Sequence, residues 1–159
     1  MADVLYTELK DKTVQDFIKN MDKRLKDIKG GKRKYTGLLS AIVFKDVQSH
    51  FTAEEGPKGP WAKWSPSYVE QLKKAGRAGN KKLQYTGKLR QNFKPTDVKS
   101  SARGILWFND AVTKSGYPYA AGHNDGDGQL PQREFMWLSG SALDDINVQT
   151  LQFMIDEGV

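Results

Sequence analysis

The 159-residue chain contains no cysteine, which excludes disulfide scaffolds, cysteine-ligated zinc sites and thiol nucleophiles. Its two histidines, His50 and His123, are too few for a metal site built from histidine alone. No stretch approaches the roughly 18 apolar residues that a membrane-spanning helix requires. The N-terminal sequence MADVLYTELKDK lacks the basic-then-apolar pattern of a signal peptide. We therefore expect a protein that is made in a cytoplasm and has no membrane partner.

Motifs of the common enzyme classes are missing as well. The sequence has no GxSxG nucleophile elbow, no Walker A loop and no HExxH zinc motif. Asp110, Asp125, Asp127 and Glu134 could supply a carboxylate pair for glycoside hydrolysis, but acidic residues are common in turns and spacing in the sequence does not give the separation of the carboxylates in space. We expect no catalytic residue and no cofactor, so the protein is predicted not to be an enzyme.

Charge is unevenly distributed along the chain. Residues 1–100 contain 22 Lys and Arg against 11 Asp and Glu, whereas residues 101–159 contain 3 against 8. The first part therefore carries +11 and the second −5, which gives the formal net charge of +6. This polarity suits contact with nucleic acid or with an acidic protein surface. It equally suits head-to-tail self-assembly, and composition does not choose between them.

Two amphipathic helices are predicted in the first third of the chain. Apolar residues recur at helical spacing over 13–29 and again over 35–51. Because the linker between them is short, we expect an antiparallel helical hairpin. His50, at the end of the second helix, is interpreted as a structural histidine with satisfied hydrogen bonds.

The middle of the chain is predicted to be mostly turn and loop. Residues 54–66 hold three prolines and two glycines and are expected to form no regular structure. Ser65 and Pro66 then favour the start of a short helix. The next segment, 75–82, contains two glycines and is expected to be an exposed loop. The basic residues of this loop and of the two positions before it form the strongest basic cluster in the chain, which is predicted to be a contact surface: Lys73, Lys74, Arg77, Lys81 and Lys82.

The last part of the chain is predicted to contain a small sheet. The β-prone runs 91–99 and 103–109 predict an antiparallel hairpin, and 134–139 is a candidate third strand. Residues 117–131 are expected to be loop with one helical turn. Gly87 lies at the junction of the helical and strand halves, where a glycine is typical of a positive φ or a close backbone approach.

A final helix is predicted over 142–156, capped by Ser141. Its apolar residues are expected to face inward: Leu143, Ile146, Leu151 and Ile155. The whole chain, 1–159, is then a single domain of the α+β class, with an N-terminal helical hairpin, short helices, a small antiparallel sheet and a C-terminal helix.

The segment 123–134 is similar to a calcium-binding loop. Counted from His123, it places acidic residues and a glycine at positions 3, 5, 6 and 12. The first ligand is nevertheless a histidine where an oxygen donor is needed, and Pro131 occupies position nine. An ordinary turn cluster that binds no metal is the interpretation we favour.

Residues 58–99 support a different reading, a nucleic-acid-binding module. This region has eleven Lys and Arg against two acids, interleaved with aromatic residues: Trp61, Trp64, Tyr68, Tyr85 and Phe93. Basic groups and aromatics are the ingredients of single-strand binding. The same aromatics would also serve as anchors of a small core.

Three segments, in this order and spacing, resemble the phage virion morphogenesis family of tail-completion proteins. They are DVQSHF at 46–51 with PKGPWAKWSPS at 57–67, LQYTGKLRQNF at 83–93, and YAAGHNDG with LPQREFMWLS within 119–139. The residues on which the resemblance rests are Trp61, Trp64, Tyr85, Thr86, Gly87, Leu89, Tyr119, Ala120, His123, Gly126, Pro131, Arg133 and Phe135.

The resemblance implies a structural protein of a tailed phage or prophage, located in the virion at the head–tail junction after assembly in the host cytoplasm. Such a protein completes the tail and allows head–tail joining by protein–protein assembly, without catalysis. The implied partners are other neck and tail proteins, such as a tail terminator and a head–tail connector, and copies of itself in a ring, commonly a hexamer. DNA contact would be incidental. The resemblance also implies that His123 and Gly126 set the backbone geometry that seats Arg133 and Phe135.

Overall fold

The computed structural model describes Lys19, Lys23 and residues 31–96, 98–101, 104–128 and 130–156. In these ranges the chain forms five helices and two antiparallel sheets of two strands each, and about half of it is helical. The predicted α+β class is confirmed. None of the described helices is long and apolar enough to cross a membrane.

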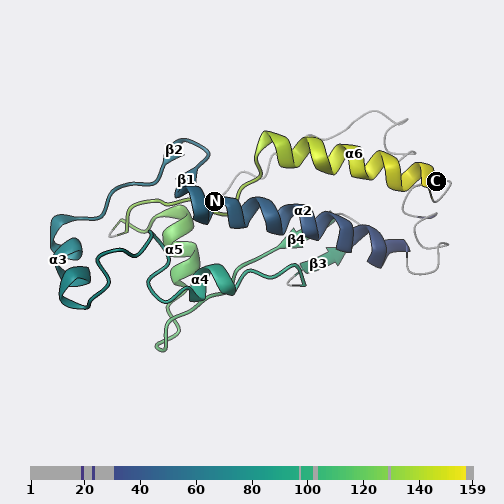
Figure 1. Cartoon of the computed structure of the whole chain (residues 1–159). Coiled ribbons are helices and arrows are strands. Elements are labelled where there is room, and N and C mark those ends of the chain that lie inside the picture. Colours follow the sequence, from purple (N-terminus) through teal and green to yellow (C-terminus); the bar gives the residue numbers. More distant parts are fainter. Residues whose placement is uncertain are drawn as a thin grey trace.

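The long helix α2, Gly31–Ala53, is the axis of the structure (Figure 1). It contains the predicted helix 35–51 and begins earlier, inside the expected linker. The helix predicted over 13–29 lies outside the described residues, apart from the helical and exposed Lys19 and Lys23, and so does its pairing with α2.

The terminal helix α6, Gly140–Asp156, runs antiparallel along α2 (Figure 1). The ring of Tyr35 on α2 lies 5.3 Å from that of Phe153, and its hydroxyl lies 3.0 Å from Oγ1 of Thr150. The helix begins two residues earlier than predicted because Ser139, not Ser141, is the cap: its Oγ accepts a hydrogen bond from N of Ala142 at 3.2 Å.

The prediction that the apolar residues of the last helix face inward is wrong for three of the four. Ile146 is half-buried, but Leu143, Leu151 and Ile155 are exposed at 48%, 61% and 73%. The inner face of α6 is instead made by Ala142, Ile146 and Phe153. These residues are separated by four and seven positions and so share one side of the helix.

The elements formed by residues 55–74 and 119–125 lie toward the C-terminal end of α2 (Figure 1). Helix α3, Pro66–Lys74, begins as predicted, with Oγ of Ser65 accepting from N of Tyr68 at 3.3 Å. Residues 54–66 were expected to lack regular structure, and this is wrong for β1, Glu55–Gly56, which pairs with β2, Gly59–Pro60. Residues 57 and 58 form the turn between the two strands, and the ladder joins Glu55 to Pro60 and Gly56 to Gly59. Helix α5, Tyr119–Asp125, supplies the helical turn expected in 117–131.

The predicted hairpin of the second half is confirmed by β3, Val98–Ser101, paired antiparallel with β4, Gly104–Trp107. The first strand starts at residue 98 rather than 91, and the start of the predicted run belongs to a short helix, α4, Lys88–Gln91. Leu89 and Phe93 are both buried. In a strand Gln91 would share their face, whereas the helical turn leaves it exposed.

The third strand predicted over 134–139 is not formed. This segment has no neighbouring strand among the described residues, and side chains satisfy its backbone instead. Oδ1 of Asn124 accepts from the amides of Phe135 and Met136 at 3.1 and 3.0 Å, and the indole of Trp61 donates to the carbonyl of Glu134 at 2.9 Å. These bonds replace the ladder that an extended segment would otherwise need.

Helix α2 completes this set of bonds. Nδ1 of His50 lies 3.0 Å from the carbonyl oxygen of Phe135, and the ring stacks on Trp137 at 4.1 Å. His50 thus packs as a structural residue, but the expectation that its hydrogen bonds are all satisfied is wrong: Nε2 is buried without a hydrogen-bond partner among the described residues, 3.7 Å from the carboxylate of Asp46. The carboxylate of Asp46 accepts from N and Oγ of Ser139 at 2.9 and 2.6 Å. The helix thus fixes both ends of the 134–139 segment.

The core lies where this segment crosses the end of α2. Phe51 and Phe135 are 0% and 1% exposed, with ring centroids 5.1 Å apart, and Trp61 meets Phe51 edge-on at 5.8 Å. The buried cluster comprises Val43, Val47, Phe51, Trp61, Leu89, Phe93, Ala111, Ala120 and Phe135.

We predict that Asp46→Ala destabilises the fold by about 1–3 kcal/mol, because it leaves the Ser139 amide without its acceptor. Chemical denaturation followed by tryptophan fluorescence measures the change. Lys45→Ala, at the neighbouring exposed position, is the control and should stay within about 0.5 kcal/mol of the parent. Equal losses in the two variants would contradict the role given to Asp46.

Candidate functional site

A cleft of about 720 Å³ opens beside the end of α2, between α3, α5 and the coil that joins α3 to α4. We call it the aromatic cleft. Four aromatic rings face it, and its charged lining residues are all basic; no carboxylate lines it among the described residues. The lining comprises Lys63, Trp64, Ser65, Tyr68, Leu72, Asn80, Lys81, Leu83, Tyr85, Thr86, Leu89, Thr113, Tyr119, His123, Leu130, Pro131 and Arg133.

One wall of the cleft is built by the start of α3. Trp64, Tyr68 and Leu72 are four residues apart and therefore share one side of that helix and its cap. The rings of Trp64 and Tyr68 meet edge-on at 5.8 Å, while Leu72 is buried beneath them. On the facing coil, Tyr85 is 45% exposed and the guanidinium of Arg77 lies 4.4 Å above its ring. The cleft therefore presents large, partly solvated aromatic surface.

The coil that carries Tyr85 is attached to the C-terminal end of α2. Nζ of Lys81 donates to the carbonyl oxygen of Thr52 at 2.8 Å, and Nε2 of Gln84 donates to that of Phe51 at 2.7 Å. Arg90 adds a bond from Nε to Oε1 of Gln48 at 2.6 Å. Carbonyls at a helix C-terminus lack partners within the helix and carry partial negative charge, so a basic segment is well suited to cap them.

Glu54 anchors the same coil. Its φ of 59° places it in the left-handed region just past the end of α2, where a glycine is more usual. Nζ of Lys82 lies 2.9 Å from its carboxylate, and the amide of Lys82 donates to the other oxygen. Burial tends to raise the pKa of Glu54, but the hydrogen bonds and charge of Lys82, with a smaller effect of Lys81, lower it overall.

Arg133 brings a buried cation to the opposite wall. Its side chain donates from Nε to the carbonyl of Ala62 at 3.1 Å and from Nη2 to that of Lys63 at 3.4 Å, and the residue is 5% exposed. Burial lowers the pKa of Arg133, against smaller opposing effects of Tyr68 and Glu54. Among the described residues no carboxylate lies within 4 Å of its guanidinium. A buried cation in this state favours a carboxylate supplied from outside.

His123, on α5, lines the cleft next to Arg133. Burial, and then the positive charge of Arg133, lower the pKa of His123 despite the opposing effect of Asp127. The imidazole is therefore neutral at pH 7. The backbone carbonyl oxygen of His123 accepts a hydrogen bond from the backbone N of Arg133 at 2.7 Å. The resemblance implied that His123 sets the backbone geometry around Arg133, and this bond joins the two backbones directly.

The residues of the resemblance fall into three groups. Most line the cleft: Trp64, Tyr85, Thr86, Leu89, Tyr119, His123, Pro131 and Arg133. Trp61, Ala120 and Phe135 belong to the core. Gly87 and Gly126 bound short helices, with φ of 74° and 77°. Three segments that are distant in the sequence thus converge on one site.

The basic cluster is less exposed to partners than its sequence suggests. Lys81 and Lys82 are bound to the end of α2 as described above, and Arg77 donates to the carbonyl of Tyr85. Lys73 and Lys74 end α3 and are exposed, Lys73 with a 2.8 Å ion pair to Glu70. The expectation of an exposed loop is therefore wrong for Arg77 and Lys82, which are both half-buried. The hydrogen bonds of this loop hold it against α2 and Tyr85.

In the segment 123–134, which is similar to a calcium-binding loop, side chains form hydrogen bonds within the protein. Oδ1 of Asp127 accepts from N of Leu130 at 2.7 Å, and its other oxygen accepts from the hydroxyl of Tyr117. Asn124 is used by the 134–139 segment, as described above. The described residues contain no group of three or more histidine or acidic side chains placed to hold a metal.

Sequence reasoning named Tyr68 only for the nucleic-acid alternative, not as a wall of this cleft, and it missed Lys63 and Asn124. The four-residue spacing of Trp64, Tyr68 and Leu72 was a readable signal for the first. No local pattern marks Asn124, whose partners lie 11 and 12 residues further along the chain.

The chain matches no protein-family model, no curated protein and no solved structure. The function of the chain is therefore inferred from its sequence motifs and from the geometry of the aromatic cleft.

The lowered pKa of Glu54 has a consequence for stability. A folded-state pKa below the unfolded value of about 4.5 means that this stabilisation is complete above that pH and is lost as the pH falls through the folded value. We expect the melting temperature of the parent to fall about 2–4 °C more than that of Glu54→Gln between pH 7 and about pH 3. Glu70→Gln, which removes an exposed pair, should keep the parental pH profile.

Gly87 gives a second test of the cleft's architecture. A β-branched side chain is strained at its φ of 74°, and its Cβ would meet Nε2 of Gln91 at 3.3 Å. Gly87→Val should destabilise by about 1–3 kcal/mol, and Gly87→Asn by less, because asparagine tolerates this conformation. Gly79→Val, in open space, is the control. A melting temperature of Gly87→Val equal to that of the parent would show that the conformation is incidental.

Proposed function

We propose that the chain is a structural protein of a tailed phage or prophage that completes the tail and allows head–tail joining. It acts by protein–protein assembly at the head–tail junction of the virion. The observation that carries the proposal is the convergence of the three family-like segments on the aromatic cleft. Residues that a family would share for its function are expected to meet in space, and eight of these residues line one cleft.

The chemistry of the cleft supports a protein partner. Partly exposed aromatic rings around a basic group are typical of the centre of a protein interface. The buried guanidinium of Arg133 is suited to a carboxylate from a docked side chain. Candidate partners are a tail terminator, a head–tail connector or another copy of the chain within a ring.

A nucleic-acid-binding module is the alternative, and the geometry favours it less. Of the aromatics in residues 58–99, Trp61 and Phe93 are buried at 4% and 1% exposure and cannot stack on bases. Among the cations, Arg77, Lys81 and Lys82 hold the coil to α2 and to Tyr85. What remains is an open cleft rather than a basic groove that could follow a phosphate backbone.

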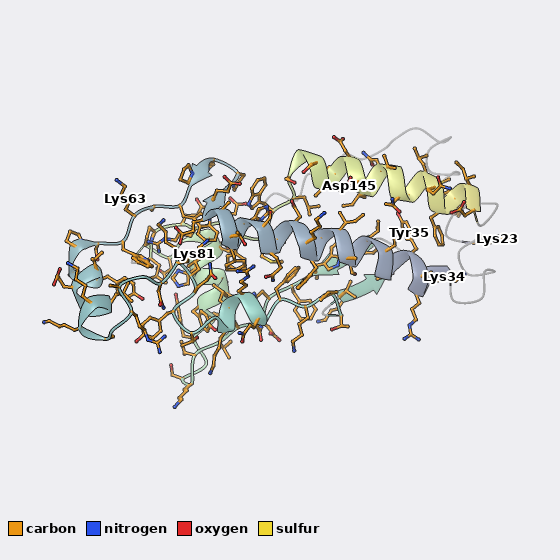
Figure 2. All side chains as sticks on the ribbon, in the orientation of Figure 1. Lys23, Lys34, Tyr35, Lys63, Lys81 and Asp145 are labelled. Atoms are coloured by element: carbon orange, nitrogen blue, oxygen red, sulfur yellow. The ribbon has the colours of Figure 1, made fainter. Side chains whose placement is uncertain are left out.

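We expect Lys63→Glu to reduce the yield of infectious particles at least tenfold when the variant replaces the parent in the phage that encodes it. Lys63 is exposed at the rim of the cleft (Figure 2), so the reversed charge opposes docking without disturbing the core. Lys58→Glu makes the same charge change at an exposed position outside the cleft and should leave the yield unchanged.

The same pair of variants separates the alternatives. Under the assembly proposal, heads and tails accumulate unjoined with Lys63→Glu, as seen by electron microscopy, and binding to single- and double-stranded DNA is weak in the parent. Tight, salt-dependent DNA binding by the parent that Lys63→Glu abolishes, together with normal joining, would favour the nucleic-acid alternative.

A further inference from the structure

The outer face of α6 is an apolar surface with no partner in the described structure. Val148, Leu151 and Ile155 recur at intervals of three and four residues and form one stripe along the helix. They are 60%, 61% and 73% exposed, whereas Ile146 and Phe153 on the opposite side face α2. Such a row of large exposed side chains on one helix marks an interaction surface.

The charge of α6 is of one sign. The helix contains Asp144, Asp145 and Asp156 and no Lys or Arg. Asp144 lies four residues before Val148, in line with the stripe, and is exposed, as is the neighbouring Asp145 (Figure 2). Asp145 also lines a groove against α2, so the carboxylate that belongs to the stripe itself is that of Asp144.

The aromatic cleft has the complementary composition. Its described lining has aromatic rings and the cations Lys63, Lys81 and Arg133, but no carboxylate. The apolar side chains of the stripe match the rings of Trp64 and Tyr85, and the carboxylate of Asp144 is complementary to the cations. The same chain thus carries two unfilled surfaces that fit each other in chemistry.

These surfaces cannot meet within one chain. The cleft lies at the end of the molecule where α3 and α5 are found, whereas the last turns of α6 lie beside the start of α2 (Figure 1). The contact of Tyr35 with Thr150 and Phe153 fixes that end of α6 in place. A contact between the stripe and the cleft must therefore join two copies.

We propose that the α6 stripe of one copy docks in the aromatic cleft of the next. The inference rests on the proposed assembly function and names its partner, a second copy of this chain. Because the two surfaces differ, the contact is heterologous, so each added copy presents a new vacant cleft or stripe, and assembly continues until the chain of subunits closes.

Two single variants and their mixture test this contact. Leu151→Lys places a cation on the stripe, and Lys63→Glu places an acid at the cleft; Gln152→Lys and Lys58→Glu are the matched exposed controls. Light scattering of the purified full chain measures mass against concentration. The parent and both controls should form assemblies above the 17.9 kDa monomer that dissociate at high salt, and each variant should associate at least tenfold more weakly.

The equimolar mixture gives the decisive result. Lys63→Glu retains an intact stripe and Leu151→Lys an intact cleft, so the two should form one heterodimer, twice the monomer mass, and stop there. A parent that stays monomeric at millimolar concentration, variants that assemble like the parent, or a mixture that stays monomeric would overturn the inference. So would a Leu151→Lys melting temperature several degrees below that of Gln152→Lys, because the stripe would then be covered by the chain itself, for example by residues 13–29.

This outcome is distinguishable from the failure of the proposed function. If Lys63→Glu abolishes head–tail joining but the purified parent does not self-associate, the assembly function stands and the second copy is the wrong partner. If the heterodimer forms as expected but neither variant affects infectious particles, the contact stands and the proposed function is wrong.

Discussion

The backbone of residues 134–139 pairs with no strand in the described part of the chain, and the architecture around the cleft depends on how its polar groups are satisfied. Asn124 from α5, Trp61 from the coil before α3, and His50 and Asp46 from α2 each supply a hydrogen-bonding side chain to this short extended segment. Unsatisfied buried amides and carbonyls are costly, so these bonds orient the elements that donate and accept them. The same segment places Phe135 in the core and Arg133 beside the cleft.

A second constraint is the end of α2. Its last carbonyls receive side chains from the basic coil, and Glu54 holds that coil through Lys82. Part of the excess positive charge in residues 58–99, that of Lys81, Lys82 and Arg90, has this local explanation, since cations near a helix C-terminus are favourable. Composition suggested a surface for an acidic partner, whereas the geometry uses part of that charge internally and leaves Lys63 and Arg133 at the cleft.

The parts of the fold that could be predicted are those with local signals. The period of apolar residues identified α2, Ser65 and Pro66 identified the start of α3, and two neighbouring β-prone runs identified the β3–β4 hairpin. The 134–139 segment has the composition of a strand, but its partners are side chains from distant positions, which no local pattern reveals.

The prediction of which side of α6 faces inward was wrong for a related reason. An amphipathic helix with apolar residues on more than one side does not say which side meets α2. The motif residues that line the cleft could be picked out one by one from the sequence. Only the structure shows that they lie together.

The bonds that satisfy residues 134–139 join positions far apart in the chain. Ser139 reaches back 93 residues to Asp46, Phe135 reaches 85 to His50, and Glu134 reaches 73 to Trp61. During synthesis, α2 and its neighbours leave the ribosome long before their partners exist. Closing such long loops is entropically unfavourable until many contacts form together, so it comes late in folding. The wall of the cleft that carries Arg133 is therefore set only after residue 139 has been made, and a chain truncated before that residue cannot form the finished cleft.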